Sequence, residues 1–308
     1  MILTVTLNPA IDFTVFGEEF IPHQTNRGQD IAPDPGGKGN NAARIAKRLG
    51  SEAMVTGFIG GFTGDYIQSQ LRLEGMQTAY YIIDRTTRMT VSFIEKTTGK
   101  ETKIVPFGPE ITDDEAEAFC HHYDHLIRTH RFSIVALCGS LPRGLPADFY
   151  GRLIDIAGER DTPAILDSSG EALSAGIEHY PFLIKPNVAE AMELAGVKRD
   201  DVFDSMKELC SKAKLVALTM EAEGAIFFSE RKTVKVHCEA RDAINPVGAG
   251  DAFIGGFAAA FDRFGPDEEK LFSWAVTAGT CTAHSAGLLW SIDDFEKRWK
   301  WITIREIG

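Results

Sequence analysis

The chain has 308 residues, of which 44% are hydrophobic and 25% are charged, and 32 basic against 44 acidic side chains give a net charge of −12. These values are ordinary for a folded globular protein and exclude a disordered, collagen-like or coiled-coil chain as a whole. The negative charge argues against binding of nucleic acid by general charge attraction, although locally placed lysines or arginines could still hold a small anion.

Short apolar runs alternate with amphipathic segments through most of the chain. The first run covers residues 2–7, and residues 41–49 then carry apolar side chains at helical spacing, with Gly50 as a stop signal. Later apolar runs are separated by helical patterns: the runs lie at residues 134–137, 164–166, 182–184 and 215–218, and the helical patterns at 149–157, 188–195 and 202–213. This alternation predicts an α/β fold with a mostly parallel sheet and helices on both faces.

Two other stretches, residues 13–31 and 90–107, show strand-like alternation without a helical pattern. The second carries a hairpin signal at Thr97-Thr98-Gly99-Lys100. We expect these stretches to form a small sheet that projects from the core and serves as a lid or an oligomer interface. A further hairpin is expected at residues 225–229 and 233–236.

Small or polar residues follow each of the four central apolar runs. They are Gly139-Ser140, Asp167-Ser168-Ser169, Lys185-Pro186-Asn187 and Thr219. Ligands of open α/β sheets bind beyond the carboxyl ends of the strands, so four such ends in succession predict a binding site there. Polar turns alone would give the same pattern at any single strand.

The sequence Gly36-Gly37-Lys38-Gly39-Asn40-Asn41 opens the first amphipathic segment. Glycines let the backbone approach an anion, the N–H groups and helix dipole attract it, and Lys38 adds a full charge. The spacing matches neither the P-loop nor the dinucleotide fingerprint. A flexible loop with a solvated lysine is the alternative interpretation.

A second glycine loop, Pro246-Val247-Gly248-Ala249-Gly250-Asp251, runs into residues 252–264, which are apolar or small on all sides and predict a buried helix. The N–H groups of Ala249, Gly250 and Asp251 would form an anion hole, and the Asp251 carboxylate would be a proton acceptor beside it. This combination is what transfer of a phosphoryl group to an alcohol requires. The alternative is an ordinary acidic residue in the first turn of a helix.

Cysteine usage and the N-terminal residues predict a cytoplasmic protein. The five cysteines are far apart and form no C-x-x-C pair, so the sequence predicts neither a disulfide framework nor a zinc site. The opening residues MILTVTLNPAID lack the basic segment of a signal peptide, and no stretch reaches the about 18 apolar residues that cross a bilayer. We therefore expect no membrane partner.

The chain resembles the PfkB (ribokinase-like) carbohydrate kinases, and within them the hexose-phosphate branch. The motifs that carry the resemblance follow in order: TLNPAID at residues 6–12, GGKGNNAA at 36–43, TRMTV at 87–91, CGSLPRG at 138–144, LDSSGEAL at 166–173, IKPNVAE at 184–190 and NPVGAGDAF at 245–253. The resemblance implies one kinase domain over residues 1–308, with a β-lid formed by about residues 12–33 and 88–107. It also implies ATP and Mg²⁺, a sugar-phosphate substrate and a homodimer joined through the lid.

The same resemblance implies roles for individual residues. Asp251 would be the catalytic base, and the backbone of Gly248, Ala249 and Gly250 would hold the charge of the transferred group. The sugar phosphate would be bound by Asp12, Arg27, Gly37, Lys38, Asn41, Arg88 and Ser140, and the nucleotide by Lys185, Asn187, Thr219, Glu221 and Gly224. Glu190 would hold Mg²⁺ through water. Structural alternatives are a turn cap for Asp12, solvent-facing positions for Arg27 and Arg88, and a first-turn helix acid for Glu190.

Three positions depart from the family pattern. Glu221 replaces a glycine beside the expected nucleotide path, Thr90 replaces an asparagine, and Pro246 replaces a threonine. We expect phosphorylation of fructose 1-phosphate to fructose 1,6-bisphosphate, as in 1-phosphofructokinase. The alternatives are tagatose-6-phosphate kinase and 6-phosphofructokinase, and, because of Glu221, a non-catalytic sugar-phosphate binding protein.

Overall fold

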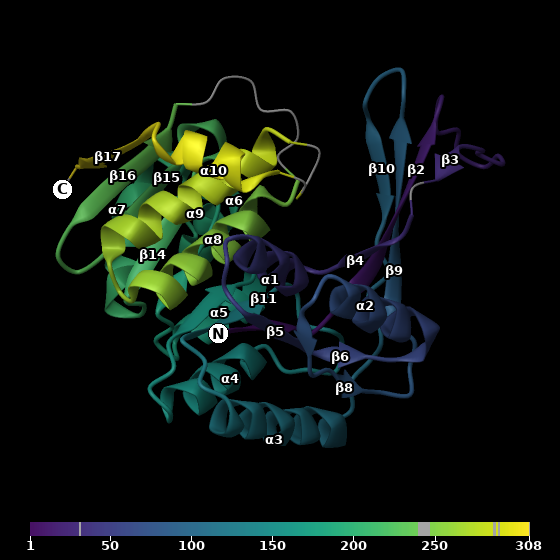
Figure 1. The fold of residues 1–308 in the computed structure, drawn as a ribbon, viewed down its shortest axis with the longest axis horizontal. Coiled ribbons are helices and arrows are strands. Elements are labelled where there is room, and N and C mark those ends of the chain that lie inside the picture. Colours follow the sequence, from purple (N-terminus) through teal and green to yellow (C-terminus); the bar gives the residue numbers. More distant parts are fainter. Residues whose placement is uncertain (31, 240–246, 286–287, 289, 308) are drawn as a thin grey trace.

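The computed structural model describes residues 1–30, 32–239, 247–285, 288 and 290–307. Its largest element is a ten-stranded sheet in the order β17-β16-β15-β14-β13-β12-β11-β1-β5-β7, with helices on both faces (Figure 1). The strands are β1 (Ile2–Thr6), β5 (Ala53–Thr56), β7 (Gln77–Thr78), β11 (Ile134–Cys138), β12 (Ala164–Asp167), β13 (Leu183–Ile184), β14 (Leu215–Thr219), β15 (Ala225–Phe228), β16 (Thr233–Cys238) and β17 (Ile302–Glu306). The predicted α/β fold is thereby confirmed.

The strands from β7 to β14 pair in parallel, and the chain changes direction across the sheet at β1. From β1 it proceeds to β5 on one side, and it later returns to β11 on the other. Such a switch point leaves a crevice at the carboxyl ends of the two strands. Because β11, β12, β13 and β14 are also parallel neighbours, the polar residues that follow them gather at this same edge. The hairpin of β15 and β16, expected from the sequence, extends the sheet in antiparallel fashion.

Two buried layers of side chains attach the helices to the large sheet. One face is covered by α3 (Asp113–Thr129), α4 (Phe149–Gly158), α5 (Gly170–Ile177), α6 (Val188–Ala195) and α7 (Val202–Glu208). The other face is covered by α1 (Lys38–Arg48), α8 (Ala249–Phe264), α9 (Glu268–Ala283) and α10 (Ile292–Trp299). The helix expected at residues 202–213 is shorter than predicted, because α7 ends at Glu208 and a 3₁₀ turn, Leu209–Ser211, follows it.

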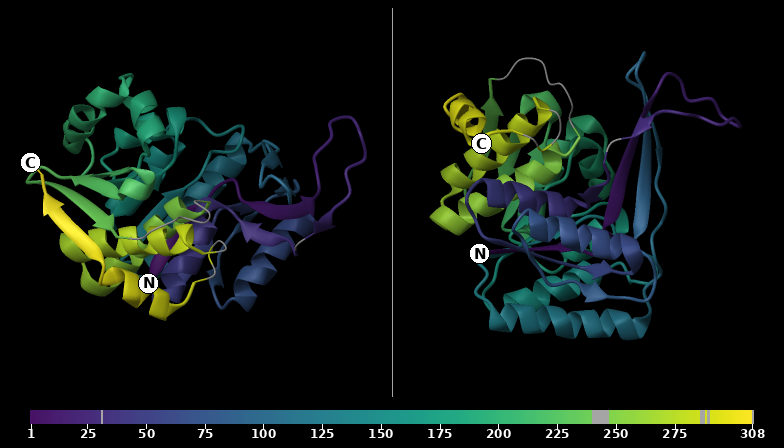
Figure 2. Two further views of the ribbon diagram at one scale, coloured as in Figure 1. Left: turned by 90° about the horizontal axis from the view of Figure 1, so that it is seen from above. Right: turned by 45° about the vertical axis from the view of Figure 1, so that its right-hand side comes forward.

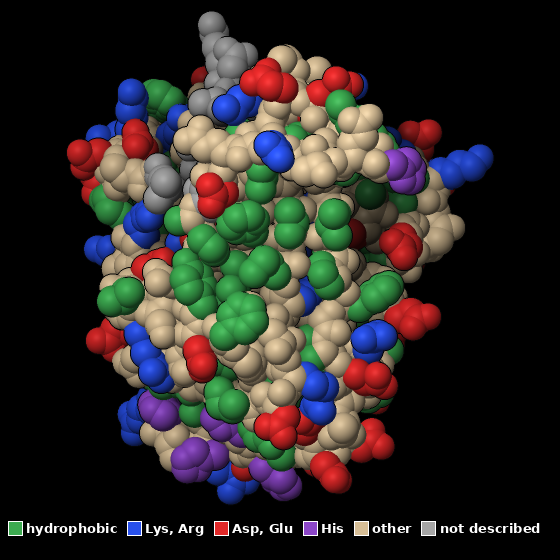
Figure 3. Space-filling view, turned by 90° about the vertical axis from the view of Figure 1, so that its right-hand side faces the viewer, with side chains coloured by type: hydrophobic (Ala, Val, Ile, Leu, Met, Phe, Trp, Pro, Cys, Tyr) green, Lys and Arg blue, Asp and Glu red, His purple; other side chains and the backbone are tan. Residues whose placement is uncertain are grey.

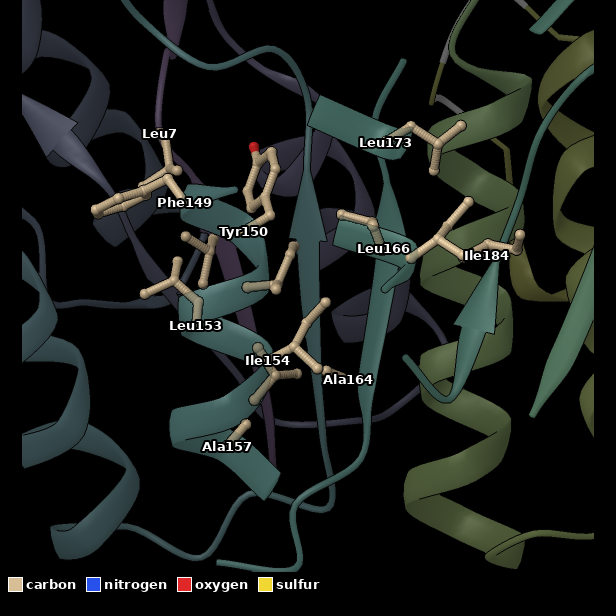
Figure 4. Close-up of a cluster of buried hydrophobic side chains, with 14 of the residues drawn as sticks. Leu7, Phe149, Tyr150, Leu153, Ile154, Ala157, Ala164, Leu166, Leu173 and Ile184 are labelled. Carbon is tan, nitrogen blue, oxygen red and sulfur yellow. The ribbon is translucent and has the colours of Figure 1, made fainter. Parts of the chain in front are cut away.

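Figure 4 shows a part of the first layer, in which α4 packs its apolar side chains against the sheet. Tyr150 points its hydroxyl toward the carboxyl end of β11, where it donates to the carbonyl oxygens of Cys138 and Gly139 at 3.0 and 3.1 Å. The Ser168 hydroxyl, after β12, also donates to the Gly139 oxygen at 3.0 Å. These bonds hold the backbone just beyond β11 in place and join it to the residue that follows β12.

A second sheet stands beside the core, on the right of Figure 1, and projects beyond it (Figure 2). Its strand order is β10 (Glu101–Ile104), β9 (Arg88–Glu95), β2 (Ala10–Gly17) and β3 (Gln29–Asp30), and β4 (Asp34–Gly36) also pairs with β2. The base of this second sheet packs through Ile11 against α1 and α2 (Gly61–Leu73), next to a small pair of strands, β6 (Phe58–Ile59) and β8 (Tyr81–Ile82).

The two stretches expected to form this sheet contribute unequally. Thr97-Thr98-Gly99-Lys100 forms the predicted turn between β9 and β10. Most of residues 18–28, however, are exposed and lie outside any strand, so the prediction of strand-like structure across residues 13–31 was too long. The segment contains Pro22, which lacks a backbone donor, and the Asn26 side chain bonds the Ile21 backbone instead of leaving it to a neighbouring strand.

Candidate active site

The first turn of α8 lies at the crevice edge and is fixed by close helix packing. A Cβ atom at Gly255 would lie 2.5 Å from the Ala42 carbonyl oxygen of α1, and one at Gly256 would lie 2.7 Å from the Trp274 oxygen of α9. Only glycine permits these approaches. Gly248 begins the helix with φ of 81°, and the first intrahelical bond runs from the Ala252 nitrogen to the Gly248 oxygen at 2.9 Å. The N–H groups of the three residues between them are therefore directed out of the helix end.

Asp251 lies in this first turn, partly buried, and contacts α1. Its Oδ2 accepts a hydrogen bond from Asn41 Nδ2 at 2.8 Å. Burial raises the pKa of Asp251 to about 6, the Asp167 charge adds to the rise, and the Asn41 bond and the ammonium groups of Lys38 and Lys185 oppose it. The structure therefore brings together a carboxylate that titrates near neutral pH and a set of outward-directed amides.

Two lysines converge on a buried carboxylate beside this turn. Asp167, the last residue of β12, is 1% exposed, and its Oδ1 lies 3.3 Å from Lys185 Nζ and 3.6 Å from Lys38 Nζ. Lys185 is itself 6% exposed, and its Nζ would lie 3.5 Å from a Cβ atom at Gly250. The Lys185 ammonium group thus lies next to the amides of the α8 first turn. The sequence motif contained Asp167, but it gave no reason to single it out.

The first glycine loop is held rigidly under the crevice. Asn40 is fully buried: its side-chain nitrogen donates to the Gly36 oxygen at 2.9 Å, and its oxygen accepts from the Tyr80 hydroxyl at 2.6 Å. Gly37 adopts φ of 115°, and a Cβ atom there would lie 2.7 Å from the Thr6 methyl group. These contacts argue against the alternative of a flexible loop with a solvated lysine. The turn before Lys38 is fixed, and the Lys38 ammonium group faces Asp167.

Asp12 lies on the second sheet directly above this loop, where a Cβ atom at Gly36 would come within 2.2 Å of its Oδ2. Burial raises the pKa of Asp12, and the cations Lys103 and Arg88 counteract part of the rise. Arg88 also donates to the carbonyl oxygens of Asn8 at 2.8 Å and Pro106 at 3.1 Å. Arg27 lies on the exposed segment after β2, and no described contact joins it to these groups.

Lys103 was missed by the sequence reasoning. It stands opposite Ser92 of β9, which stands opposite Thr14 of β2, so it shares the sheet face of Asp12. Polar side chains at alternate positions of β2 and β9 could have indicated this face, but the pairing with β10 could not be read from one sequence. Ser140 is exposed and follows β11, at the carboxyl edge of the large sheet.

The expected nucleotide residues follow β13 and β14. Asn187 caps α6: its side chain accepts from the Glu190 nitrogen at 2.9 Å, and Glu190 Oε2 accepts from the Asn187 nitrogen at 2.9 Å. Thr219 pairs with Asn187 in a parallel bridge. Gly224 has φ of 85°, and a Cβ atom there would lie 2.2 Å from the Val236 oxygen. The backbone therefore requires glycine at this position whether or not a nucleotide binds there.

The described residues contain no group of three or more acidic, histidine or cysteine side chains placed to hold a metal ion. A site built entirely from protein ligands is therefore absent from that part of the chain. Mg²⁺ normally keeps several waters and takes one or two carboxylates besides substrate phosphates. Glu190, partly exposed and already engaged in a helix cap, fits such an indirect role through water.

The cysteines, the membrane question and Pro246 were also raised by the sequence. All five cysteines are free and buried. No helix within the described ranges combines the length and the apolar character needed to span a bilayer. Pro246, singled out as a departure in the second glycine loop, lies outside the described residues.

Comparison with known proteins gives consistent matches over nearly the whole chain. The model of the pfkB family carbohydrate kinases matches residues 4–293. The 1-phosphofructokinase of Bacillus subtilis (strain 168) is 37% identical over 292 residues, which is 94% of each protein. Two structures of phosphofructokinase-2 from Escherichia coli, the tetrameric inhibited form and the complex with fructose-6-phosphate, are each 28% identical and cover 97% of this chain and 98% of their own, with TM-scores of 0.88 and 0.85.

Proposed function

The chain belongs to the pfkB family of carbohydrate kinases, and we propose that it transfers the γ-phosphoryl group of ATP to fructose 1-phosphate, giving fructose 1,6-bisphosphate. The observation that carries the proposal is the Asp251 carboxylate beside the outward-directed amides of the α8 first turn. The Bacillus subtilis relative supports the choice of fructose 1-phosphate, because it is named 1-phosphofructokinase and the match covers 94% of its length.

In the proposed reaction Asp251 takes the proton of the acceptor hydroxyl. The amides of Ala249 and Gly250, after the Gly248 turn, hold the charge that develops on the transferred group, and Lys185 adds a full positive charge beside them. A base whose pKa lies near 6 is ionised at neutral pH and still basic enough to accept a proton in the transition state.

The two sides of the crevice divide the substrates in this proposal. Asp12, Gly37 and Asn41 would bind the sugar hydroxyls. The phosphate of the sugar would be held by three cations and one hydroxyl group, those of Lys38, Arg88, Lys103 and Ser140. Arg27, on its exposed segment, is a further candidate for this phosphate. Lys185, Asn187, Thr219, Glu221 and Gly224 would line the nucleotide. Mg²⁺ would neutralise phosphate charge, held through water by Glu190.

A second candidate is phosphorylation of fructose 6-phosphate. The Escherichia coli neighbour in complex with fructose-6-phosphate favours it, because that protein shares the fold across the whole chain. A phosphate subsite can hold either end of a ketose, so tagatose 6-phosphate belongs to the same alternative. A non-catalytic sugar-phosphate binding protein is the remaining alternative.

An ADP-release assay with MgATP tests the proposed function directly. We expect the highest kcat/KM with fructose 1-phosphate, lower values with fructose 6-phosphate and tagatose 6-phosphate, and no activity with unphosphorylated fructose. A higher kcat/KM with either 6-phosphate would reassign the substrate. Binding of a ketose phosphate by calorimetry without any ADP release would show the non-catalytic alternative.

The Asp251→Asn variant tests the proposed base. We expect kcat to fall by at least about 10²-fold while sugar-phosphate binding persists, because the amide keeps the shape of the side chain and loses the ability to accept a proton. The wild-type enzyme should lose activity as pH falls through about 6, since protonation of a carboxyl whose pKa is raised removes the base. A flat rate between pH 5 and about 7 would contradict the assignment.

Lys103 is proposed as a ligand of the substrate phosphate, and Lys103→Ala tests it against a nearby lysine. The variant should raise KM for the sugar phosphate about tenfold and leave KM for ATP unchanged, because one charge-assisted contact is lost on the sugar side only. Lys100→Ala is the control, since Lys100 lies at the exposed turn of the same hairpin. Equal effects of the two variants would remove Lys103 from the site.

We also propose that the second sheet is the lid of the active site and joins two copies of the chain. One row across its strands is apolar, with Phe13, Val91 and Ile104 opposite one another. Figure 3 shows hydrophobic side chains gathering on the side of the molecule that bears this sheet. Ile104, at the end of β10, is 59% exposed, and Val105 and Phe107, which follow it, are 54% and 78% exposed. Exposed apolar side chains that gather in a patch are typical of an interface between proteins.

Sedimentation measurements test the proposed dimer. The wild-type chain should sediment as a dimer at micromolar concentration, and Ile104→Glu should shift it toward the monomer, because a carboxylate would be buried in the apolar row. Ile292→Glu is the control, as Ile292 is an exposed isoleucine at the start of α10, away from the second sheet. A monomeric wild-type chain, or equal behaviour of both variants, would reject the interface.

A further inference from the structure

Asp167 is the most deeply buried carboxylate of the site. Its side chain is 1% exposed, and neither oxygen accepts a hydrogen bond from the described residues. A buried carboxylate is costly unless cations neutralise it. Here the neutralising groups are the buried Lys185 at 3.3 Å and the partly exposed Lys38 at 3.6 Å, so the three charges form one cluster.

The two lysines come from opposite sides of the crevice. Lys38 begins α1 directly after the first glycine loop, whereas Lys185 follows β13 and lies beside Gly250 of the α8 first turn. Asp167 lies between them on a rigid support. Its strand pairs with β11, and its carbonyl oxygen accepts from the Gly139 nitrogen at 2.9 Å.

We propose that Asp167 is a positioning residue that holds Lys38 on the sugar side and Lys185 on the nucleotide side of the point where the phosphoryl group is transferred. The inference rests on the proposed function. Without the Asp167 charge, the two ammonium groups would lie close together with no anion between them and would repel. Lys38, which is 39% exposed, could then turn toward solvent, whereas Lys185 is 6% exposed and has little freedom to move.

The same cluster influences the proposed base. Around the Asp251 carboxyl stand Asn41, the two lysines, Asp167 and the buried Cys138 thiol. Asp167 raises the pKa of Asp251 and the lysines lower it, so the anion offsets part of the lysines' effect. Loss of the Asp167 charge should therefore lower the pKa of Asp251. A residue that only filled space would have no such effect.

Kinetics of Asp167→Asn, measured across pH with fructose 1-phosphate and MgATP, test the proposal. We expect kcat to fall at least about tenfold, KM to rise for both substrates, and the acid limb of kcat/KM to move to lower pH. Asp155→Asn is the control, because Asp155 pairs with His179 on the surface at 2.8 Å and should leave all three quantities unchanged. An unchanged acid limb together with unchanged KM values in Asp167→Asn would overturn the proposal.

A double-mutant cycle separates action through the lysines from general damage to the fold. If Asp167 works by holding Lys185, then Asp167→Asn should cost little further activity in a Lys185→Met enzyme, and the two effects should be strongly non-additive. Fully additive effects, in this cycle and in the matching one with Lys38→Met, would reject the proposal.

A second substitution at position 167 and the activity of the wild-type enzyme distinguish the remaining outcomes. If Asp167→Asn does not fold, Asp167→Glu keeps the charge and displaces the carboxylate; kcat should then fall while the acid limb stays near its wild-type pH, and an unchanged kcat would overturn the proposal. A wild-type enzyme that is inactive with every ketose phosphate rejects the proposed function. An active wild type with an indistinguishable Asp167→Asn enzyme rejects only the role of Asp167.

Discussion

The contact between α1 and α8 is the constraint on which the rest of the site depends. Glycine at position 255 lets α8 approach the Ala42 carbonyl so closely that the first turns of the two helices share one edge of the crevice. As a result Asn41 of α1 reaches Asp251 of α8 at 2.8 Å, although the two residues lie far apart in the sequence. Both helices are buried against the large sheet, so this geometry is supported by the core and does not depend on the loops.

Electrostatics then separates the roles of three carboxylates in one crevice. Asp167 faces Lys185 and Lys38, and Asp12 is near Lys103 and Arg88. Asp251 accepts a hydrogen bond from the Asn41 amide and interacts with the two lysines through longer-range electrostatics. Burial raises the pKa of Asp251 to about 6, and this carboxyl lies in the same helix turn as the outward-directed amides. A chain of net charge −12 can thus present anion-binding groups, because the cations are concentrated where the substrates would lie.

The sequence predicted those features that depend on local pattern. The strand ends, the two glycine loops and the buried helix after Asp251 are each encoded by a short run of consecutive residues. The family motifs indicated the order in which they follow one another. Asp167 and Lys103 escaped for a common physical reason, since their importance arises from pairing between distant segments: Asp167 with Lys38 and Lys185, and Lys103 with the face of Asp12. The length of the exposed segment at residues 18–28 was also missed, because turn bonds within it replaced the expected ladder.

Glu221 shows how the fold can accept a departure from its family pattern without losing the backbone that the pattern encodes. Its φ of 49° lies in the region that glycine adopts freely, at a cost of roughly 1–2 kcal/mol for another residue. The turn is nevertheless closed by the Met220 nitrogen bonding the Gly224 oxygen at 2.8 Å, and Gly224 is fixed against the Val236 oxygen. The backbone of this turn therefore adopts, with Glu221, a conformation that is open to glycine without strain. Because the Glu221 side chain is exposed, its charge is screened by water, which reduces the repulsion that a buried carboxylate would impose on a bound phosphate.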